Sequence, residues 1–172
     1  MPAASAQELY IVVFRLGTEE YSIPVSHVQE IQRCHRLSLP RQMPDIPEYF
    51  EGIIDLRGQI IPILDLRKRF HLNPQEPGRE SCYIIVETHH DMVGFLVDAV
   101  SEVLRVSADL FTPPPARLRT AVSARYMVGV GKLKNKDENA RRERLVVLLD
   151  IDKILNEDET NPQTSQGEAL AG

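Results

Sequence analysis

The stretch GIIDLRGQIIPILDLRKRF, residues 52–70, predicts the fold class of this chain. Two apolar runs rich in isoleucine and leucine lie on either side of the dipeptide Arg57-Gly58. Two such runs separated by two residues, one of them glycine, are typical of a β-hairpin. We therefore predict a hairpin with Arg57-Gly58 at its tip and with Asp55 facing Ile60 across the ladder.

Asp-Leu-Arg occurs twice in this stretch, and its two acids suggest a catalytic pair. In the predicted hairpin, Asp65 lies about 17 Å along the strands from Asp55. Two carboxylates that act on one bond lie within about 10 Å of each other. The spacing therefore excludes a catalytic pair. It favours Asp55 as a turn residue and Asp65 as the N-cap of a helix over LRKRF, an arrangement that Asp150 repeats before IDKIL.

Composition narrows the function classes. The chain has 172 residues, 20 of them basic and 25 acidic, with a formal net charge of -5. This charge disfavours nucleic acid and anionic membranes as partners. The N-terminus has no signal-peptide pattern and no apolar run approaches the length of a membrane span, so we expect a cytoplasmic protein. Cys34 and Cys82 have no metal-ligand spacing and are predicted to be buried free thiols.

Short β-branched segments separated by turn signals continue along the chain, and they favour barrels or sandwiches over a parallel sheet with helices. Residues 25–33 could form a short helical turn and then a strand, residues 100–106 fit either a strand or a helical turn, and periodicity does not decide these assignments. Residues 151–155 are predicted to be helical. The predicted strands are 9–16, 19–25, 82–87, 92–97, 126–133 and 145–149.

A segment rich in proline, glycine and charge at 73–81 predicts a boundary between two lobes. We expect one domain over 7–155, and the tails 1–6 and 156–172 are predicted to be disordered. Lobe one is expected over about 7–72 and lobe two over about 82–155.

The second lobe repeats the pattern of the first. When residues 23–31 are placed over 95–103, Val28 meets Val100 and Glu30 meets Glu102. A later segment continues the match in the same order, with Gly52 over Gly129 and Asp65 over Asp150. Collinear matches in two segments predict two similar all-β lobes.

Other motifs have simpler interpretations than chemistry. His89-His90-Asp91 is better interpreted as an exposed turn than as a metal site, because no third ligand is identifiable. Gly129-Val130-Gly131 lacks the third glycine of a dinucleotide-binding loop. The charged residues 134–144 include three acids and no aromatic residue, which favours a solvated hairpin loop over a nucleic-acid contact. No catalytic, metal-binding or cofactor-binding motif is identified.

Several segments resemble the CheW family, the coupling proteins of bacterial chemosensory arrays. The hairpin GIIDLRGQIIPILDLRKRF is similar to the signature hairpin of that family. FRLGTEEYSIPVSHVQEI, VGFLVDAVSEVL and YMVGVGKL followed by LVVLLDIDKIL are similar to further segments of it, in the same order. The resemblance implies an all-β fold of two small five-stranded β-barrel lobes that pack through a shared hydrophobic core, with short helical segments.

The resemblance also implies a non-enzymatic adaptor that binds the cytoplasmic tips of chemoreceptors and the regulatory domain of the histidine kinase CheA. Ring assembly with the kinase and recruitment to receptor arrays at the inner membrane follow from it, without cofactors, nucleic acid or direct membrane contact. An alternative is an adaptor of a non-flagellar pathway such as type IV pilus twitching motility. The implied protein-binding residues are Val28 and Glu30 in a receptor-facing groove, Arg57 and Gly58 at the receptor and kinase junction, and Phe111 and Leu118 toward the kinase.

Two hypotheses from other classes are kept for comparison. A hydrolase would have to use Asp55 or Asp65, against the spacing given above. A barrel that binds single-stranded nucleic acid would depend on the charged residues 134–144 and would bind most strongly at low salt.

Overall fold

The computed structural model describes residues 7–34, 46–89, 91–118, 120, 122–134 and 143–156. Strands dominate, with short helical turns at their ends. The elements are β1 (Glu8–Leu16), β2 (Glu19–Pro24), η1 (Val25–His27), β3 (Val28–Arg33), β4 (Phe50–Leu56), β5 (Gln59–Asp65), α1 (Leu66–Arg69), β6 (Cys82–Glu87), β7 (Met92–Val97), β8 (Ala99–Ser107), η2 (Ala108–Leu110), η3 (Ala124–Tyr126), β9 (Met127–Leu133), β10 (Arg144–Leu149) and α2 (Ile151–Leu155).

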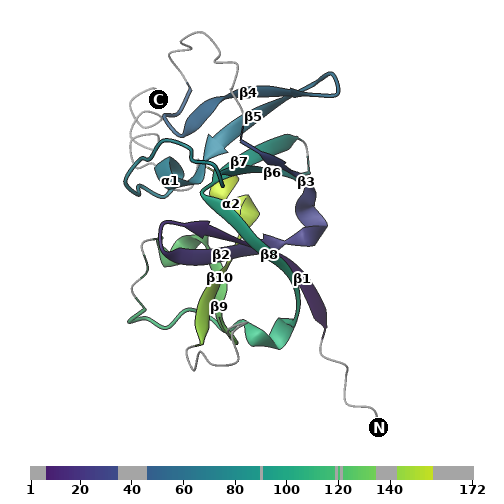
Figure 1. Ribbon diagram of the computed structural model, residues 1–172. Helices are drawn as coiled ribbons and strands as arrows, with labels where there is room; N and C mark the ends of the chain where they lie inside the picture. The colour runs from purple at the N-terminus through teal and green to yellow at the C-terminus, as the bar shows by residue number, and fades with distance from the viewer. Residues whose placement is uncertain are drawn as a thin grey trace, which may run out of the picture.

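The strands form two five-stranded sheets (Figure 1). Sheet 1 has the order β8-β1-β2-β10-β9, and sheet 2 has the order β3-β6-β7-β5-β4. In Figure 1, sheet 1 occupies the lower half of the molecule and sheet 2 the upper half, with α2 between them. The predicted all-β fold of two five-stranded lobes is confirmed. Within the described residues each sheet ends in two edge strands, so the lobes are open sheets rather than closed barrels.

The predicted lobe boundary at 73–81 is wrong, because the two halves of the chain exchange strands. β1 and β2 pair with β8 and β10, while β6 and β7 pair with β3 and β5. Each sheet therefore combines the first hairpin of one half with the last three strands of the other half. The repeat itself is confirmed, since this exchange gives both sheets the same strand order.

The β4–β5 hairpin forms as predicted. Asp55 pairs with Ile60, and a two-residue turn lies beyond them. Both turn residues have positive φ, 54° at Arg57 and 84° at Gly58, as the right-handed twist of the strands favours in such turns. The backbone N–H of Gly58 donates to the Asp55 carboxylate at 2.8 Å, which assigns Asp55 to the turn.

Both predicted helix caps are confirmed. Asp65 accepts from the backbone N–H of Arg67 at 2.9 Å, and Asp150 accepts from that of Lys153 at 3.3 Å. Each acid is also held through its own backbone N–H, which donates to the carbonyl of Tyr49 or of Tyr126. Burial raises the pKa of the Asp65 carboxyl, and the N–H of Arg67 only partly opposes that shift.

Three apolar clusters hold the fold. The interlobe core joins side chains of both sheets, including Phe14 and Tyr21 from sheet 1 and Ile84 and Phe95 from sheet 2. A second cluster, around Tyr83, fills the far side of sheet 2, and a third fills the far side of sheet 1. The predicted shared core is therefore present.

A buried arginine crosses the interlobe region. Arg69 of α1 is 6% exposed, and its guanidinium lies 5.1 Å from the ring centroids of both Tyr49 and Tyr126. It donates to the Ile154 carbonyl at the end of α2 and to the Tyr126 hydroxyl, each at 2.8 Å. Two aromatic faces and a helix C-terminus thus stabilise this charge, and Arg69 ties the two halves of the repeat together.

The structure decides the two segments that periodicity left open. Residues 25–33 form the turn η1 and then β3, and residues 100–106 lie within the strand β8. Cys34 and Cys82 are free, as predicted, but they are half-buried rather than buried. The predictions for 1–6, 157–172 and the loop residues 135–142 lie outside the described residues.

Candidate interaction site

An apolar strip runs along the edge strands β3 and β8, where the two sheets meet. Val28 and Ile31 on β3, and Val100 and Val103 on β8, all have cross-strand partners in the interlobe core. Cross-strand partners share a face of the sheet, so these four side chains border the interlobe region. The partners are Val86, Ile84, Phe14 and Val12.

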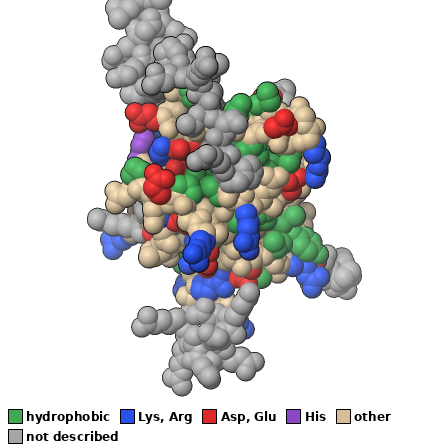
Figure 2. Space-filling model, turned by 45° about the horizontal axis from the view of Figure 1, so that its top comes forward, with side chains coloured by type: hydrophobic (Ala, Val, Ile, Leu, Met, Phe, Trp, Pro, Cys, Tyr) green, Lys and Arg blue, Asp and Glu red, His purple; other side chains and the backbone are tan. Residues whose placement is uncertain are grey.

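Part of this strip is open to solvent. Val28 and Val100 are half-buried, whereas Ile31 is 38% exposed, Val103 is 56% exposed and the neighbouring Tyr10 is 52% exposed. Figure 2 shows hydrophobic side chains gathered in patches between charged ones. Exposed apolar side chains on edge strands are suited to contact another protein. Val28 therefore lies on the interlobe strip.

Glu30 lies elsewhere than the interlobe strip. Its cross-strand partner Ile85 belongs to the cluster on the far side of sheet 2. Its carboxylate lies 3.4 Å from the guanidinium of Arg57, at the hairpin tip. The structure therefore groups Glu30 with Arg57 and Gly58, and Val28 with the interlobe strip.

The hairpin tip projects and carries an exposed arginine. The β4–β5 hairpin extends beyond the rest of sheet 2 in Figure 1. The side chain of Arg57 is 83% exposed, and the nearby Ile60 is 66% exposed. An exposed arginine beside an exposed isoleucine on a rigid turn is suited to bind a partner carboxylate and an apolar contact together.

In sheet 1 the repeat equivalent of Glu30 is enclosed instead. Arg144 lies 2.8 Å from the carboxylates of both Glu20 and Glu102, and the side chain of Glu102 is 8% exposed. Glu102 is the repeat equivalent of Glu30. Sequence reasoning aligned the two glutamates but missed Arg144, because nothing in the local pattern of β10 signals its ion pairs. Equivalent glutamates thus bind an exposed arginine in one sheet and an enclosed one in the other.

Phe111 and Leu118 pack against different clusters. Phe111 contacts the cluster of sheet 1, and Leu118 contacts the interlobe core; both are half-buried. Phe111 is followed by Thr112, whose backbone pairs with Val130 in both directions, at 3.0 Å and 2.8 Å, along the edge of β9. The structure therefore does not join the two residues in one cluster.

The Gly129-Val130-Gly131 motif makes room for this segment. A Cβ atom at Gly129 would lie 2.8 Å from the Thr112 carbonyl oxygen, and one at Gly131 would lie 3.0 Å from Leu110. The two glycines thus serve close packing of the Phe111 segment on β9, which is consistent with the rejection of a nucleotide-binding loop.

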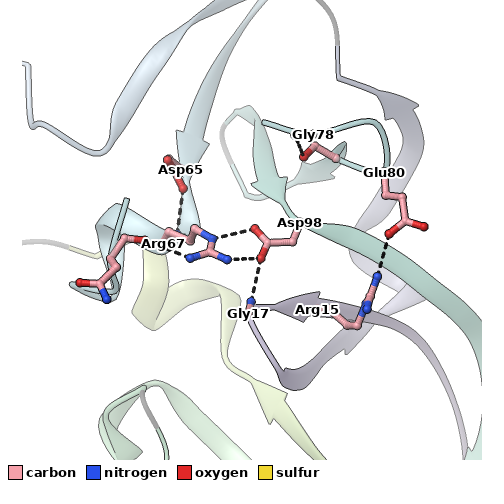
Figure 3. A network of polar contacts seen from close by, with 9 residues as sticks. Arg15, Gly17, Asp65, Arg67, Gly78, Glu80 and Asp98 are labelled. Carbon is pink, nitrogen blue, oxygen red and sulfur yellow. Dashed lines mark hydrogen bonds and ion pairs between the residues drawn. The ribbon is translucent and has the colours of Figure 1, made fainter. Parts of the chain in front are cut away.

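A polar network lies at the junction of the sheets (Figure 3). Arg67 of α1 binds Asp98 between β7 and β8 through two nitrogens, and Asp98 also accepts from the backbone N–H of Gly17 at 2.7 Å. Burial alone raises the pKa of the Asp98 carboxyl, but these hydrogen bonds and the Arg67 charge together hold it below its ordinary value. The second Asp-Leu-Arg motif draws attention to Arg67. The sequence could not show its partner, because Asp98 lies far from Arg67 along the chain.

The two acids of the Asp-Leu-Arg motifs have structural partners. Asp55 accepts from the backbone N–H of Gly58 in the turn, and Asp65 accepts from that of Arg67 at the start of the helix. Searched over the described ranges, the chain holds no group of three histidine, cysteine, aspartate or glutamate side chains placed to bind a metal. None of the helices described is long and apolar enough to span a membrane.

Comparison with known proteins identifies the family. The model of the CheW-like domain matches residues 10–159. The chain belongs to the CheW-like domain family. Its relatives include the chemotaxis protein CheW of Klebsiella aerogenes, 32% identical over 148 residues that cover 86% of this chain and 82% of the relative. The chemotaxis protein CheW of Treponema pallidum is 32% identical over 161 residues, covering 91% and 88%.

A solved CheW-like structure has the same fold. The scaffolding protein TtCheW from Thermoanaerobacter tengcongensis superposes with a TM-score of 0.74 and 28% identity, over 95% of this chain and 97% of that one. These findings assign the chain to the chemotaxis scaffold proteins of the CheW-like family, as the sequence resemblance predicted. The interlobe strip, the Arg57 tip and the Phe111 segment are thus the candidate contact surfaces of a CheW-like scaffold.

Proposed function

We propose that this chain is a non-enzymatic adaptor that couples chemoreceptors to a CheA-type histidine kinase. One observation carries the proposal. Two sheets of the same strand order present unlike surfaces, an exposed Arg57 tip on sheet 2 and an enclosed Arg144 with a covered β9 edge on sheet 1. Head-to-tail assembly requires two different surfaces on each molecule, and a ring closes when such contacts alternate.

The receptor contact is proposed at the interlobe strip. The strip offers two apolar pairs, Val28 with Ile31 and Val100 with Val103. An amphipathic helix at a receptor tip can place its apolar residues on such a strip. The adaptor would then be cytoplasmic and would reach receptor arrays at the inner membrane only through the receptors.

The kinase contacts are proposed at the hairpin tip and at Phe111 and Leu118. Arg57 and Gly58, with Glu30 holding the guanidinium, form the contact at the receptor and kinase junction. Phe111, on the segment fixed to β9, and Leu118, which packs on the interlobe core, are proposed as the other kinase contacts. The regulatory domain of a CheA-type kinase is the proposed partner of both.

Co-sedimentation tests the proposal. The purified protein is mixed with receptor tip fragments held on vesicles and with the kinase, and the pelleted fractions are measured. We expect all three to pellet together, and we expect Arg57→Glu to lower the kinase in the pellet by about tenfold, because it reverses a hot-spot charge. Lys153→Glu is the control, since Lys153 is also an exposed cation and lies on α2, outside the strip, the hairpin tip and the Phe111 segment. Equal recovery of the kinase with both variants would contradict the role given to Arg57.

The same coupling in a pathway for type IV pilus twitching motility is the alternative. The repertoire of receptors and kinases that pellet with the chain distinguishes the two, because the adaptor contacts are the same in both.

A further inference from the structure

A hollow rich in arginine lies at the junction of the two sheets. Its volume is about 580 Å³, and its lining comes from both sheets and from the linker between β5 and β6. Arg15 lines it from β1, Arg33 from β3 and Arg79 from the linker. Ala99 and Val100 at the start of β8 form an apolar wall. Three arginines in one hollow are unexpected in a chain of net charge -5.

The charges around the hollow are unevenly matched. Glu20 is bound by Arg144 at 2.8 Å, outside the set of three. Glu80 lies 2.9 Å from Arg15, in an exposed pair whose side chains are 44% and 74% open to solvent (Figure 3). Across the ranges that the structure describes, the side chains of Arg33 and Arg79 make no hydrogen bond or ion pair, and both residues are exposed. Two guanidiniums therefore line the hollow without a carboxylate.

The hollow also continues into the interlobe strip. Val100 belongs to both, and Arg33 lies two residues from Ile31 on the same face of β3. The thiol of Cys82, whose pKa is raised by burial, adds no negative charge to the hollow wall. A ligand held here would therefore meet guanidinium forks next to an apolar surface.

We propose that this hollow binds a glutamate or aspartate side chain of a partner's peptide segment, with an apolar residue of that segment on the Ala99 and Val100 wall. The arginine fork matches a carboxylate in a bidentate geometry. Glu80 is paired with Arg15 and Glu20 with Arg144, so Arg33 and Arg79 are the two guanidiniums left for a ligand. The apolar wall of Ala99 and Val100 beside them favours a carboxylate carried by a peptide over free phosphate, which has no apolar group to place there. The inference does not depend on the identity of the receptor or of the kinase.

Peptide titration of the ¹⁵N-labelled full chain tests the proposal. The probes are the terminally blocked peptide Gly-Glu-Leu-Glu-Gly, its counterpart with glutamine for glutamate, and inorganic phosphate. We expect the glutamate peptide to shift the Nε–Hε signals of Arg33 and Arg79 and the backbone amides of 99–101. We expect binding of the glutamine peptide to be weaker by about tenfold or more.

Two double variants with the same change in net charge distinguish binding in the hollow from a general electrostatic attraction of the peptide to the protein. Arg33→Glu with Arg79→Glu is expected to weaken binding of the glutamate peptide by about tenfold or more. Arg105→Glu with Lys132→Glu changes the same net charge at exposed positions outside the hollow, and it is expected to retain most of the affinity. Circular dichroism of both variants checks the fold.

Three outcomes would overturn the proposal. Equal weakening by the two double variants would show a general electrostatic effect. Peptide shifts confined to other surfaces would place the contact elsewhere. Tighter binding of phosphate than of the glutamate peptide, on the same arginine signals, would assign the hollow to a free anion instead. None of these measurements contains a receptor or a kinase, so they stand apart from the test of coupling.

Discussion

The carboxylate of Glu30 on β3 lies 3.4 Å from the guanidinium of Arg57 at the tip of the β4–β5 hairpin, and this ion pair links the two edges of sheet 2. The repeat equivalent, Glu102, lies 2.8 Å from Arg144 in sheet 1. One relationship thus occurs twice, once exposed and once enclosed. The exposed copy remains available to a partner, and the enclosed copy serves the fold.

Truncation of these two arginines should therefore have different effects on stability. Arg57→Ala is expected to lower the free energy of unfolding by about 0.5 kcal/mol or less, because the arginine is 83% exposed and water screens the pair. Arg144→Ala is expected to lower it by about 3 kcal/mol, because two largely enclosed carboxylates lose their cation. Urea unfolding measures both variants. Similar losses for both would contradict the assignment of one copy to the surface.

Asp98 makes part of the stability dependent on pH. Its pKa is below the ordinary aspartate value in the folded state, so its contribution is present above that ordinary value and is lost as pH falls through the folded pKa. Asp98→Asn is expected to be less stable than the parent near pH 7, and the difference should shrink below about pH 4. Urea unfolding of both proteins between pH 7 and pH 2.5 gives this difference. Asp109→Asn, at an exposed aspartate, is the control for the amide substitution itself.

Asp65 should behave in the opposite sense. Burial raises its pKa in the folded state, so ionisation of the carboxyl lowers stability as pH rises through the unfolded and folded pKa values. Asp65→Asn keeps a capping oxygen without the charge and is expected to equal or exceed the parent in stability near pH 7. Asp65→Ala loses the cap and is expected to lower the free energy of unfolding by about 1 kcal/mol. A large loss with Asp65→Asn would contradict this account.

A substitution at Gly129 tests the close packing of the Phe111 segment on β9. Gly129→Ala places a Cβ 2.8 Å from the Thr112 carbonyl, so the segment must move or the strand must distort. We expect a loss of about 2 kcal/mol in unfolding free energy and a change in the amide signals of 110–112. Gly78→Ala is the control, because a Cβ there has no neighbour within 4 Å. Unchanged amide signals at 110–112 would show that the Phe111 segment packs on β9 without a glycine at position 129.

Arg69 tests how the buried charge is held. Arg69→Lys keeps the charge but loses the planar stacking between Tyr49 and Tyr126 and part of the hydrogen bonding, and we expect about 2 kcal/mol less stability. Arg125 also lies over the Tyr126 ring, at 4.6 Å, but is exposed. Arg125→Lys should therefore change stability by about 0.5 kcal/mol at most. Thermal and urea unfolding of the two lysine variants give the comparison.

Local patterns were sufficient for the strands and their turns. The hairpin at Arg57-Gly58, the caps at Asp65 and Asp150 and the helix at 151–155 all depend on neighbours within a few residues, and all are confirmed. The repeat was also visible, because equivalent strands require equivalent side chains. Family membership followed from the same segments, and the comparisons confirm it.

The tertiary structure alone decided how those strands combine. The linker at 73–81 predicted two lobes in sequence order, but β1 and β2 pair across the chain with β8 and β10. The residue pattern of a strand determines which of its faces is buried. It does not determine which strand pairs with it, since similar apolar strands from either half of the chain can do so. For the same reason the sequence could align Glu30 with Glu102 but could not show that one binds an exposed arginine and the other an enclosed one. Those differences depend on contacts between residues far apart in the chain, and they give the two similar sheets their unlike surfaces.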